Sequence, residues 1–362
     1  MAAHDAIPVP GPSRILIVRL SSMGDVIHAL PAAIMLRRAF PQAHIGWLIE
    51  ERWAELLCAL STPRAGPRSP ERPLVDVVHA VNLKKWRRSL FSTETVERIA
   101  AGLSDLRSCR YETAIDLQGA ARSAILARWS GAHTVHGSAQ PRENLSSLWY
   151  SRRVLTKSAH VIEQYSEIAE SVIGGHQPIP DAVFPCDPAA DRAVTNRLRA
   201  LGLHNFAILN PGAGWGAKQW PAERYGMLAQ ALAQRGIQSL INYGPREESL
   251  AASAENASAG TAYASSFSVG ELISLTRRAR LFIGGDTGPM HLAAALHIPV
   301  VALFGPTDPA RNGPFRTKSI VLRHLASPTS LTHRNDPDPG LYAISADEVA
   351  AAALKLLDGA RG

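Results

Sequence analysis

The chain has 362 residues, of which 46% are hydrophobic and 19% charged, and a formal net charge of +7. This composition is that of a globular protein long enough for two domains of ordinary size. Its three cysteines, Cys58, Cys109 and Cys186, are far apart and odd in number, which excludes a disulfide framework and a cysteine zinc site and favours reduced thiols in the cytosol. The best apolar stretch, 292–304, is interrupted by a histidine and a proline and falls short of the roughly 18 residues of a spanning helix.

The first residues and the distribution of charge give two further expectations. Residues 1–12 are small, Pro-rich and polar and lack the basic start and apolar run of a signal peptide, so we expect 1–13 to be a disordered leader. Residues 64–88 hold seven basic residues against two acidic ones, a net charge of +5. The seven are Arg64, Arg68, Arg72, Lys84, Lys85, Arg87 and Arg88. Such a patch suits an anionic partner (nucleic acid, acidic lipid head groups or a phosphorylated sugar) and is also typical of a solvated loop and helix face.

The first half of the chain alternates apolar runs with stretches of helical periodicity. Strands are expected at 14–20, 44–49, 74–81 and 113–117, and helices at 26–40, 53–60, 93–106 and 160–173. A further helix is expected after residues 118–119 and ends at residue 129. Residues 61–73 are rich in Pro, Arg and Gly and predict a loop. This alternation with short connections predicts an α/β unit with a parallel, doubly wound sheet.

The alternation stops at a Pro- and Gly-rich linker, residues 176–189, and then restarts. Strands are expected at 206–210, 238–243, 281–283 and 300–304, and helices at 222–235, 247–257, 269–278, 289–296 and 346–357. We therefore expect two Rossmann-like domains, residues 14–175 and 190–345, facing a central cleft, with a C-terminal helix in 346–362.

The stretch 281–304 predicts strand, glycine turn, short helix and strand. Gly284 and Gly285 allow a sharp turn, and Pro289 suits the first turn of a helix for which Asp286, Thr287 and Gly288 are capping candidates. A helix N-terminus beyond the carboxyl end of a parallel strand offers N–H groups to an anion. The stretch is a candidate phosphate site that includes Asp286, Thr287 and His291, or simply a well-capped helix of any α/β protein.

A second polar loop, 210–221, begins at Asn210 and carries a cation, Lys218, among glycines. Neither this loop nor the other glycine turns match G-x-G-x-x-G or G-x-x-x-x-G-K-[ST], so the nicotinamide-oxidoreductase and P-loop interpretations lack their motifs. A glycine-lined backbone with a cation can embrace a diphosphate and stabilise it as a leaving group. The alternative is a surface loop with a solvated lysine.

Asp25 follows the first strand and is the sharpest single candidate for catalysis. A carboxylate at this turn is ionised near neutral pH, since an unperturbed Asp has a pKa near ~3.9, and it could take a proton from an acceptor hydroxyl. The alternative is that Asp25 caps the helix that follows it, a common use of Asp.

Five motifs follow one another along the chain: Arg19–Pro31 (RLSSMGDVIHALP), Asp116–Gly119 (DLQG), Lys218–Pro221 (KQWP), Gly285–His291 (GDTGPMH) and Phe304–Asp308 (FGPTD). Together they resemble glycosyltransferase family 9, the ADP-heptose:lipopolysaccharide heptosyltransferases, over residues 14 to 357. The match is best with the heptosyltransferase I branch, through 21–25, 84–88 and 142–143. The resemblance implies the two-domain GT-B fold, with the acceptor bound by the first domain and the ADP-sugar by the second.

The resemblance also implies a reaction. It is the inverting transfer of L-glycero-D-manno-heptose from ADP-heptose to Kdo of Kdo2-lipid A, with no cofactor or metal, at the cytoplasmic face of the inner membrane. In this family pattern Asp25 is the general base and Lys218 contacts the donor diphosphate. Asp286 holds heptose hydroxyls, and Thr287 and Gly288 form the phosphate turn.

The remaining site residues are also given by the resemblance. On the donor side they include His291, Asn210 and an acid near the adenosine, Glu247 or Glu248. On the acceptor side they are Ser22, Met23, Gly24, Gln118, Arg122, Lys84, Lys85, Arg87 and Arg88. The basic ones would meet the carboxylate of Kdo, the phosphates of lipid A and anionic lipid of the inner membrane.

Other functions remain open at this stage. A sibling heptosyltransferase would add a later core heptose, and a GT-B-type sugar-nucleotide epimerase or hydrolase would share the fold without a lipid acceptor. An anion- or nucleic-acid-binding module would use the basic patch alone. That module would leave Asp25 and Asp286 without a role, and only Trp86 interleaves an aromatic ring with the cations, so we expect no nucleic acid partner.

Overall fold

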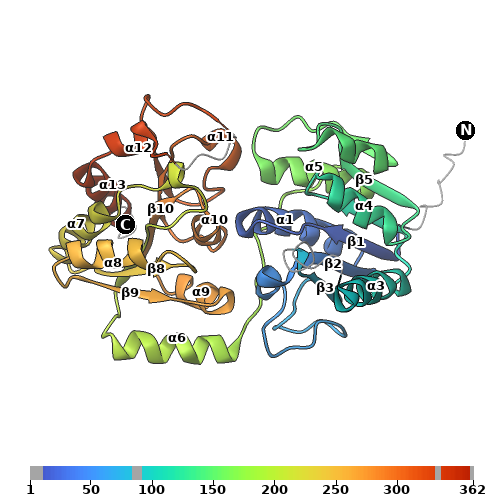
Figure 1. Cartoon of the computed structure of the whole chain (residues 1–362), viewed down its shortest axis with the longest axis horizontal. Helices are drawn as coiled ribbons and strands as arrows, with labels where there is room; N and C mark the ends of the chain where they lie inside the picture. Colours follow the sequence, from blue (N-terminus) through green and yellow to red (C-terminus); the bar gives the residue numbers. More distant parts are fainter. Residues whose placement is uncertain (1–10, 84–91, 331–335, 359–362) are drawn as a thin grey trace, which may run out of the picture.

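The computed structural model describes residues 11–83, 92–330 and 336–358. It shows two α/β units side by side, with α1 of the first facing α10 of the second across the middle of the molecule (Figure 1). Within the described residues each unit contains a six-stranded, all-parallel sheet, which confirms the predicted fold class.

The first sheet has the strand order β3-β2-β1-β4-β5-β6. Its strands are β1 (Arg14–Val18), β2 (His44–Glu50), β3 (Val77–Val81), β4 (Thr113–Asp116), β5 (Thr134–Ser138) and β6 (Arg152–Val154). Its helices are α1 (Met23–Ala39), α3 (Thr93–Ser108), α4 (Ala121–Trp129) and α5 (Val161–Ile173), with short 3₁₀ helices η1 (Glu51–Leu56) and η2 (Asn144–Trp149).

The second sheet repeats this order as β12-β11-β10-β7-β8-β9. Its strands are β7 (Phe206–Asn210), β8 (Gln238–Tyr243), β9 (Ala262–Ser266), β10 (Leu281–Gly285), β11 (Val300–Leu303) and β12 (Ser319–Leu322). Its helices are α6 (Pro188–Ala200), α7 (Ala222–Ala233), α8 (Glu248–Ala257), α9 (Val269–Thr276), α10 (Gly288–Ala295), α11 (Pro309–Asn312), α12 (Pro339–Ala343) and α13 (Ala346–Asp358), with 3₁₀ helix η3 (Gly216–Lys218).

The central strand β1 shows why each unit takes this form. All of its apolar residues are fully buried, because successive side chains of a strand point to opposite faces and both faces are covered. Ile15 and Ile17 join the cluster beneath α1 and α5, whereas Leu16 and Val18 join the cluster beneath α4. The order of strands reverses direction beside β1 and again beside β7, and in such sheets ligands bind outside the carboxyl ends of strands at these switch points.

Several boundaries differ from the sequence prediction. Helix α1 begins at Met23 rather than at residue 26, so its N-cap is Ser22, and Pro31 lies well inside the helix. The segment predicted as helix 53–60 is the 3₁₀ helix η1, and Ser13, assigned to the leader, donates to the Glu112 carboxylate. Residues 1–10 of the predicted leader lie outside the described residues.

The sequence did not predict β5, β6, β9, β12 and α6, nor the short helices η2, η3, α11 and α12. Three of these strands, β6, β9 and β12, lie at sheet edges, where one side of the strand has no neighbour and an apolar run is not needed. Helix α6 has a polar sequence but a clear start signal, since Asp187 caps it and Pro188 is its first residue.

The two units contact each other through several elements besides α1 and α10. Glu55 of η1 accepts from Gly270 N at the start of α9 (3.0 Å), and His160 contacts Gly313 O (3.0 Å). Arg311 Nη1 donates to Gln164 of α5 (3.2 Å). One hydrophobic cluster also runs from α1 into α10, so the two units share part of their core.

The loop 61–73 was predicted correctly as a loop. Its arginines, however, have partners within the chain and do not form a free basic surface. Arg72 is 1% exposed, and its guanidinium donates to the carbonyls of Pro63, Gly66, Pro67 and Val75. Arg64 and Arg68 also have acidic neighbours, at 3.5 Å from Glu51 and 3.7 Å from Asp76. Three of the seven cations are therefore engaged within the chain, and the other four lie outside the described residues.

Replacement of Arg72 by methionine tests this buried role. Arg72→Met leaves several buried carbonyl groups without a donor, and we expect the free energy of unfolding to fall by about 2–4 kcal/mol. Urea denaturation measures the change. Arg68→Met is the matched control, because its partly exposed ion pair contributes at most about 1 kcal/mol. Equal, small losses in both variants would contradict the assignment of Arg72.

Candidate functional site

The predicted site residues lie in loops that follow strands, at the carboxyl edges of the two sheets. Ser22 to Asp25 follow β1 and Gln118 follows β4, on the two sides of the first switch point. Lys218 follows β7 and Asp286 follows β10, on the two sides of the second. Asp25 and Lys218 thus follow equivalent strands of the two units, as do Gln118 and Asp286.

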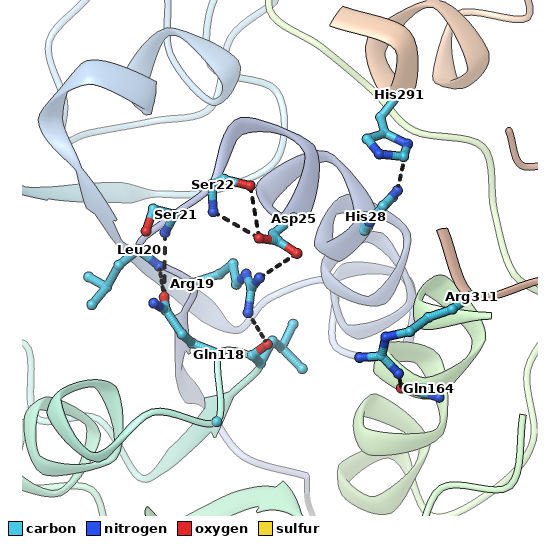
Figure 2. A network of polar contacts seen from close by, with 12 residues as sticks. Arg19, Leu20, Ser21, Ser22, Asp25, His28, Gln118, Gln164, His291 and Arg311 are labelled. Atoms are coloured by element: carbon cyan, nitrogen blue, oxygen red, sulfur yellow. Dashed lines mark hydrogen bonds and ion pairs between the residues drawn. The ribbon is translucent and has the colours of Figure 1, made fainter. Parts of the chain in front are cut away.

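Asp25 is the third residue of α1 and forms a capping box with Ser22. Its Oδ2 accepts from Ser22 N (3.0 Å) and Ser22 Oγ (2.9 Å), and its Oδ1 pairs with Arg19 Nη2 (2.7 Å) (Figure 2). Burial alone would raise the pKa of this carboxyl, but Arg19 and the Ser22 donors outweigh it and set the pKa to about 2. The side chain is still 36% exposed, so an ionised carboxylate that caps a helix also meets solvent.

Arg19 holds this carboxylate and was not singled out from the sequence. It is buried, donates through Nη1 to Leu117 O (2.7 Å) and lies over the Tyr165 ring at 5.4 Å. Burial lowers its pKa, but Asp25 raises it further, above the usual value. The signal available in the sequence was a basic residue between the apolar residues Val18 and Leu20, directly after a buried strand, where a buried charge requires a partner.

On the donor side three side chains form one polar chain. Lys218 Nζ contacts Asp286 Oδ2 at 2.5 Å, and Asp286 Oδ1 contacts His291 Nε2 at 3.0 Å. All three side chains are largely buried, and Lys218 also lies 4.6 Å from the ring centre of Trp215. Burial would raise the pKa of Asp286, but His291 and Lys218 hold it well below its usual range. Asp286 is therefore a buried anion held between two nitrogen groups.

This chain continues into the first unit through two histidines. His28 Nε2 of α1 lies 3.0 Å from His291 Nδ1 of α10, and their ring centres are 4.1 Å apart (Figure 2). Because the ionised Asp286 can only accept, His291 donates to it from Nε2, and with a neutral His291 ring Nδ1 accepts from His28 Nε2. The remaining nitrogen, His28 Nδ1, is buried without a protein partner in the described part of the chain. A cavity of about 30 Å³ is lined by both rings.

Two glycines allow the helices to come this close. A Cβ atom on Gly24 would lie 2.6 Å from the His291 ring, and a Cβ on Gly288 would lie 2.7 Å from the Met23 side chain. Each helix therefore has a glycine where the other helix presents a side chain. The N-termini of α1 and α10, where the backbone N–H groups of a helix have no intrahelical partner, lie next to each other.

Several predicted site residues have partners within the protein. Gln118 Oε1 accepts from Leu20 N (2.8 Å) and supports the loop before Asp25, and Asn210 bonds to Gly212 O and Asn242. Of the three capping candidates predicted from the sequence, Thr287 is the N-cap of α10.

Of the two acids expected near the adenosine, Glu247 lies against the loop after β7. Glu247 accepts from Gly244 N (2.8 Å), and a Cβ on Gly212 would meet its carboxylate at 2.0 Å, whereas Glu248 lies on the first turn of α8. Arg122 is exposed at the start of α4. Lys84, Lys85, Arg87 and Arg88 lie outside the described residues. In the parts of the chain that the structure describes, no three His, Cys, Asp or Glu side chains group as metal ligands.

Comparison with known proteins gives consistent matches. A model of glycosyltransferase family 9 (heptosyltransferase) matches residues 99–338. Lipopolysaccharide heptosyltransferase 1 of Pseudomonas aeruginosa is 30% identical, covering 85% of this chain and 83% of its own, and lipopolysaccharide heptosyltransferase 3 of Escherichia coli is 25% identical, covering 92% and 96%. The structure of E. coli heptosyltransferase WaaC with ADP-2-deoxy-2-fluoro heptose superposes with a TM-score of 0.71 at 27% identity, over 96% of this chain and all of that one. The predicted GT-B architecture is confirmed.

The histidine contact predicts a pH dependence of stability. Burial and then His291 hold the pKa of His28 well below 6.5, so the unfolded chain binds a proton that the folded chain excludes as the pH falls below about 6.5. The free energy of unfolding therefore decreases as the pH is lowered through that range, by up to about 1.4 kcal/mol per pH unit from this group. Above that range His28 is neutral in both states and its titration has no effect on stability.

His28→Gln keeps a side-chain N–H near the position of Nε2 and removes the titration. Urea denaturation measures the free energy of unfolding at about pH 7.5 and about pH 5.5. We expect the variant to lose less of this free energy than the wild type as the pH is lowered, because its unfolding takes up about one proton fewer. The exposed His176 gives the control variant His176→Gln, which should follow the wild type. A His28→Gln profile parallel to the wild type would contradict the buried, neutral assignment.

Proposed function

Because the chain belongs to glycosyltransferase family 9, the heptosyltransferases, we propose that it transfers heptose from ADP-heptose to Kdo of Kdo2-lipid A in lipopolysaccharide inner-core synthesis. The observation that carries this proposal is the contact between α1 and α10. Gly24, next to Asp25, lies against the ring of His291, which in turn holds Asp286. A carboxylate of the first unit and the Lys218–Asp286 pair of the second therefore lie on the two sides of one contact.

The donor would bind on the second unit. The diphosphate of an ADP-sugar carries negative charge to the N-terminus of α10, where Thr287 is the cap and free N–H groups and the helix dipole attract an anion. Lys218 would exchange part of its contact with Asp286 for a phosphate oxygen, while His291 keeps Asp286 in place to accept from heptose hydroxyls. Glu247, beside the Gly212 loop, is the acid we place near the adenosine.

The displacement then needs few groups. The acceptor oxygen forms a bond to the anomeric carbon, the bond from that carbon to the ADP oxygen breaks, and its electron pair leaves with ADP. Lys218 and the α10 N-terminus stabilise the charge that develops on the leaving diphosphate. Attack from the face opposite ADP inverts the anomeric centre.

Asp25 would take the proton of the acceptor hydroxyl. Its pKa of about 2 keeps it ionised, and such a weak base accepts the proton after the new bond has made the acceptor oxygen acidic. Arg19 fixes the orientation of this carboxylate through the 2.7 Å contact. We therefore propose that the proton is transferred late in the displacement.

The acceptor would lie on the first unit, against Ser22, Met23 and Gly24, with the exposed Arg122 available for its anionic groups. We propose that the protein works at the cytoplasmic face of the inner membrane, where a lipid-linked acceptor is held. The described residues include no helix long and apolar enough to cross a bilayer.

The test is ADP release from ADP-heptose with and without Kdo2-lipid A, for the wild type and Asp25→Asn. We expect release that depends on the acceptor in the wild type and falls by about 10²–10⁴-fold in Asp25→Asn, because proton transfer is lost, while ADP affinity is retained. Asp25→Asn also leaves Arg19 without its charge partner, which can destabilise the fold. Thermal unfolding of each variant therefore distinguishes a loss of catalysis from a loss of folded protein.

Glu94→Gln is the matched control. Glu94 is an exposed acid in the first turn of α3, paired with an arginine as Asp25 is, and its loss should leave turnover unchanged. Release of ADP without acceptor would point instead to a hydrolase. Full turnover in Asp25→Asn would overturn the assigned base.

A further inference from the structure

The short helix η2 and the residue after strand β6 expose a group of large apolar side chains to water. Leu145 is 67% exposed, Leu148 71%, Trp149 38% and Leu155 62%. In a 3₁₀ helix residues i and i+3 eclipse, so Leu145 and Leu148 lie one above the other on a single outer face. Single exposed apolar residues are ordinary, but a group of this size on one short segment marks an interaction surface.

The fold holds these side chains outward. Ser146, on the inner face of η2, is fully buried and bonds to Glu143 O (2.7 Å) and Gly119 O (3.3 Å). After the helix, Tyr150 is buried and donates to Asp116 Oδ2 (2.7 Å) at the end of β4. Because η2 is fixed at its inner face and at its end, the exposure of the leucines is a property of the folded unit.

The same segment is basic. Residues 142–157 contain four cations and one acid. The cations, all exposed, are Arg142, Arg152, Arg153 and Lys157. Arg153 lies across η2, since its Nε donates to Ser147 O (3.1 Å), and the acid, Glu143, already accepts from Ala121 N (2.9 Å). No ion pair engages these four cations within residues 11–83, 92–330 and 336–358.

This surface begins next to the loop that we assign to the acceptor. Glu143 N donates to Gly119 O (2.9 Å), and a Cβ on Gly119 would meet Arg142 N at 3.0 Å. The neighbouring Gln118 bonds to Leu20 N, at the start of the loop that leads to Asp25. A continuous set of contacts therefore connects η2 with the site.

We propose that the surface formed by η2 and β6 (residues 142–157) docks on a bilayer that contains anionic phospholipid. Leu145 and Leu148 enter the boundary of the acyl chains, Trp149 lies at the level of the head groups, and the arginines meet lipid phosphates. The combination of exposed leucines with cations that are engaged in no ion pair favours this occupant over a second protein, whose interface would be depleted of charge at its centre. That the docked surface presents the acceptor loop to a lipid-linked sugar rests on the proposed function.

The test is flotation of the full-length protein with phosphatidylcholine vesicles, with and without phosphatidylglycerol. We expect the wild type to bind the anionic vesicles more tightly, and Leu145→Ser/Leu148→Ser to bind them about tenfold or more weakly because two apolar side chains no longer leave water. Leu60→Ser/Leu325→Ser is the matched control, since both leucines are highly exposed elsewhere, and it should bind as the wild type does.

A second measurement separates docking from catalysis. ADP release with an acceptor dispersed in detergent should be unchanged in Leu145→Ser/Leu148→Ser, whereas release with the acceptor in vesicles should fall. Vesicle binding itself needs no turnover, so it tests the surface even if the proposed reaction fails.

Three results would overturn the proposal: equal binding of the wild type and the variant to anionic vesicles, no binding of the wild type, or equal binding to neutral vesicles. A wild-type dimer in sedimentation that the same variant abolishes would assign the surface to self-association instead.

Discussion

The close contact between the N-terminal turns of α1 and α10 is the constraint on which the rest of the site depends. Gly24 faces the His291 ring and Gly288 faces Met23, so neither position has room for a larger side chain without movement. The His28–His291 hydrogen bond spans the same contact. Two sheets with the same strand order are thereby joined at their switch points, and a single site can draw on both units.

The charges on the two sides of this contact are each balanced before any substrate arrives. Asp25 is neutralised by Arg19 in the first unit, and Asp286 by Lys218 in the second, so both buried or half-buried carboxylates remain ionised. Binding of a diphosphate would add negative charge next to Lys218 and the α10 N-terminus, where it is compensated. The acceptor side is extended by η2, which combines apolar and basic groups beside the Gly119 loop. The donor would thus bind beside Lys218 and α10 of the second unit, and lipid would be contacted by η2 of the first unit.

Much of the fold could be predicted from the sequence because buried strands such as β1 and β7 are continuous apolar runs, and the alternation with helices is regular. The edge strands β6, β9 and β12 gave no such signal. The loops of the site were also predictable, since each follows a strand and contains glycine. The partners within it were not: His28 and His291 are 263 residues apart, and only the packing of α1 on α10 brings them together. The choice between base and cap for Asp25 was likewise undecided because the start of α1 depends on Ser22, and the structure shows the cap without excluding the proton transfer.

The central claim, that the two units form one site through α1 and α10, can be tested by the affinity for ADP of a variant in the opposite unit. In Gly24→Ala the new methyl group must displace the His291 ring, which holds Asp286 beside Lys218. Gly102→Ala, at a helical glycine with nothing within 4 Å, is the control. Isothermal titration should show ADP binding about fivefold or more weaker in Gly24→Ala, as expected for residues in direct contact, and unchanged in Gly102→Ala. Unchanged affinity in both variants would contradict a site shared by the two units.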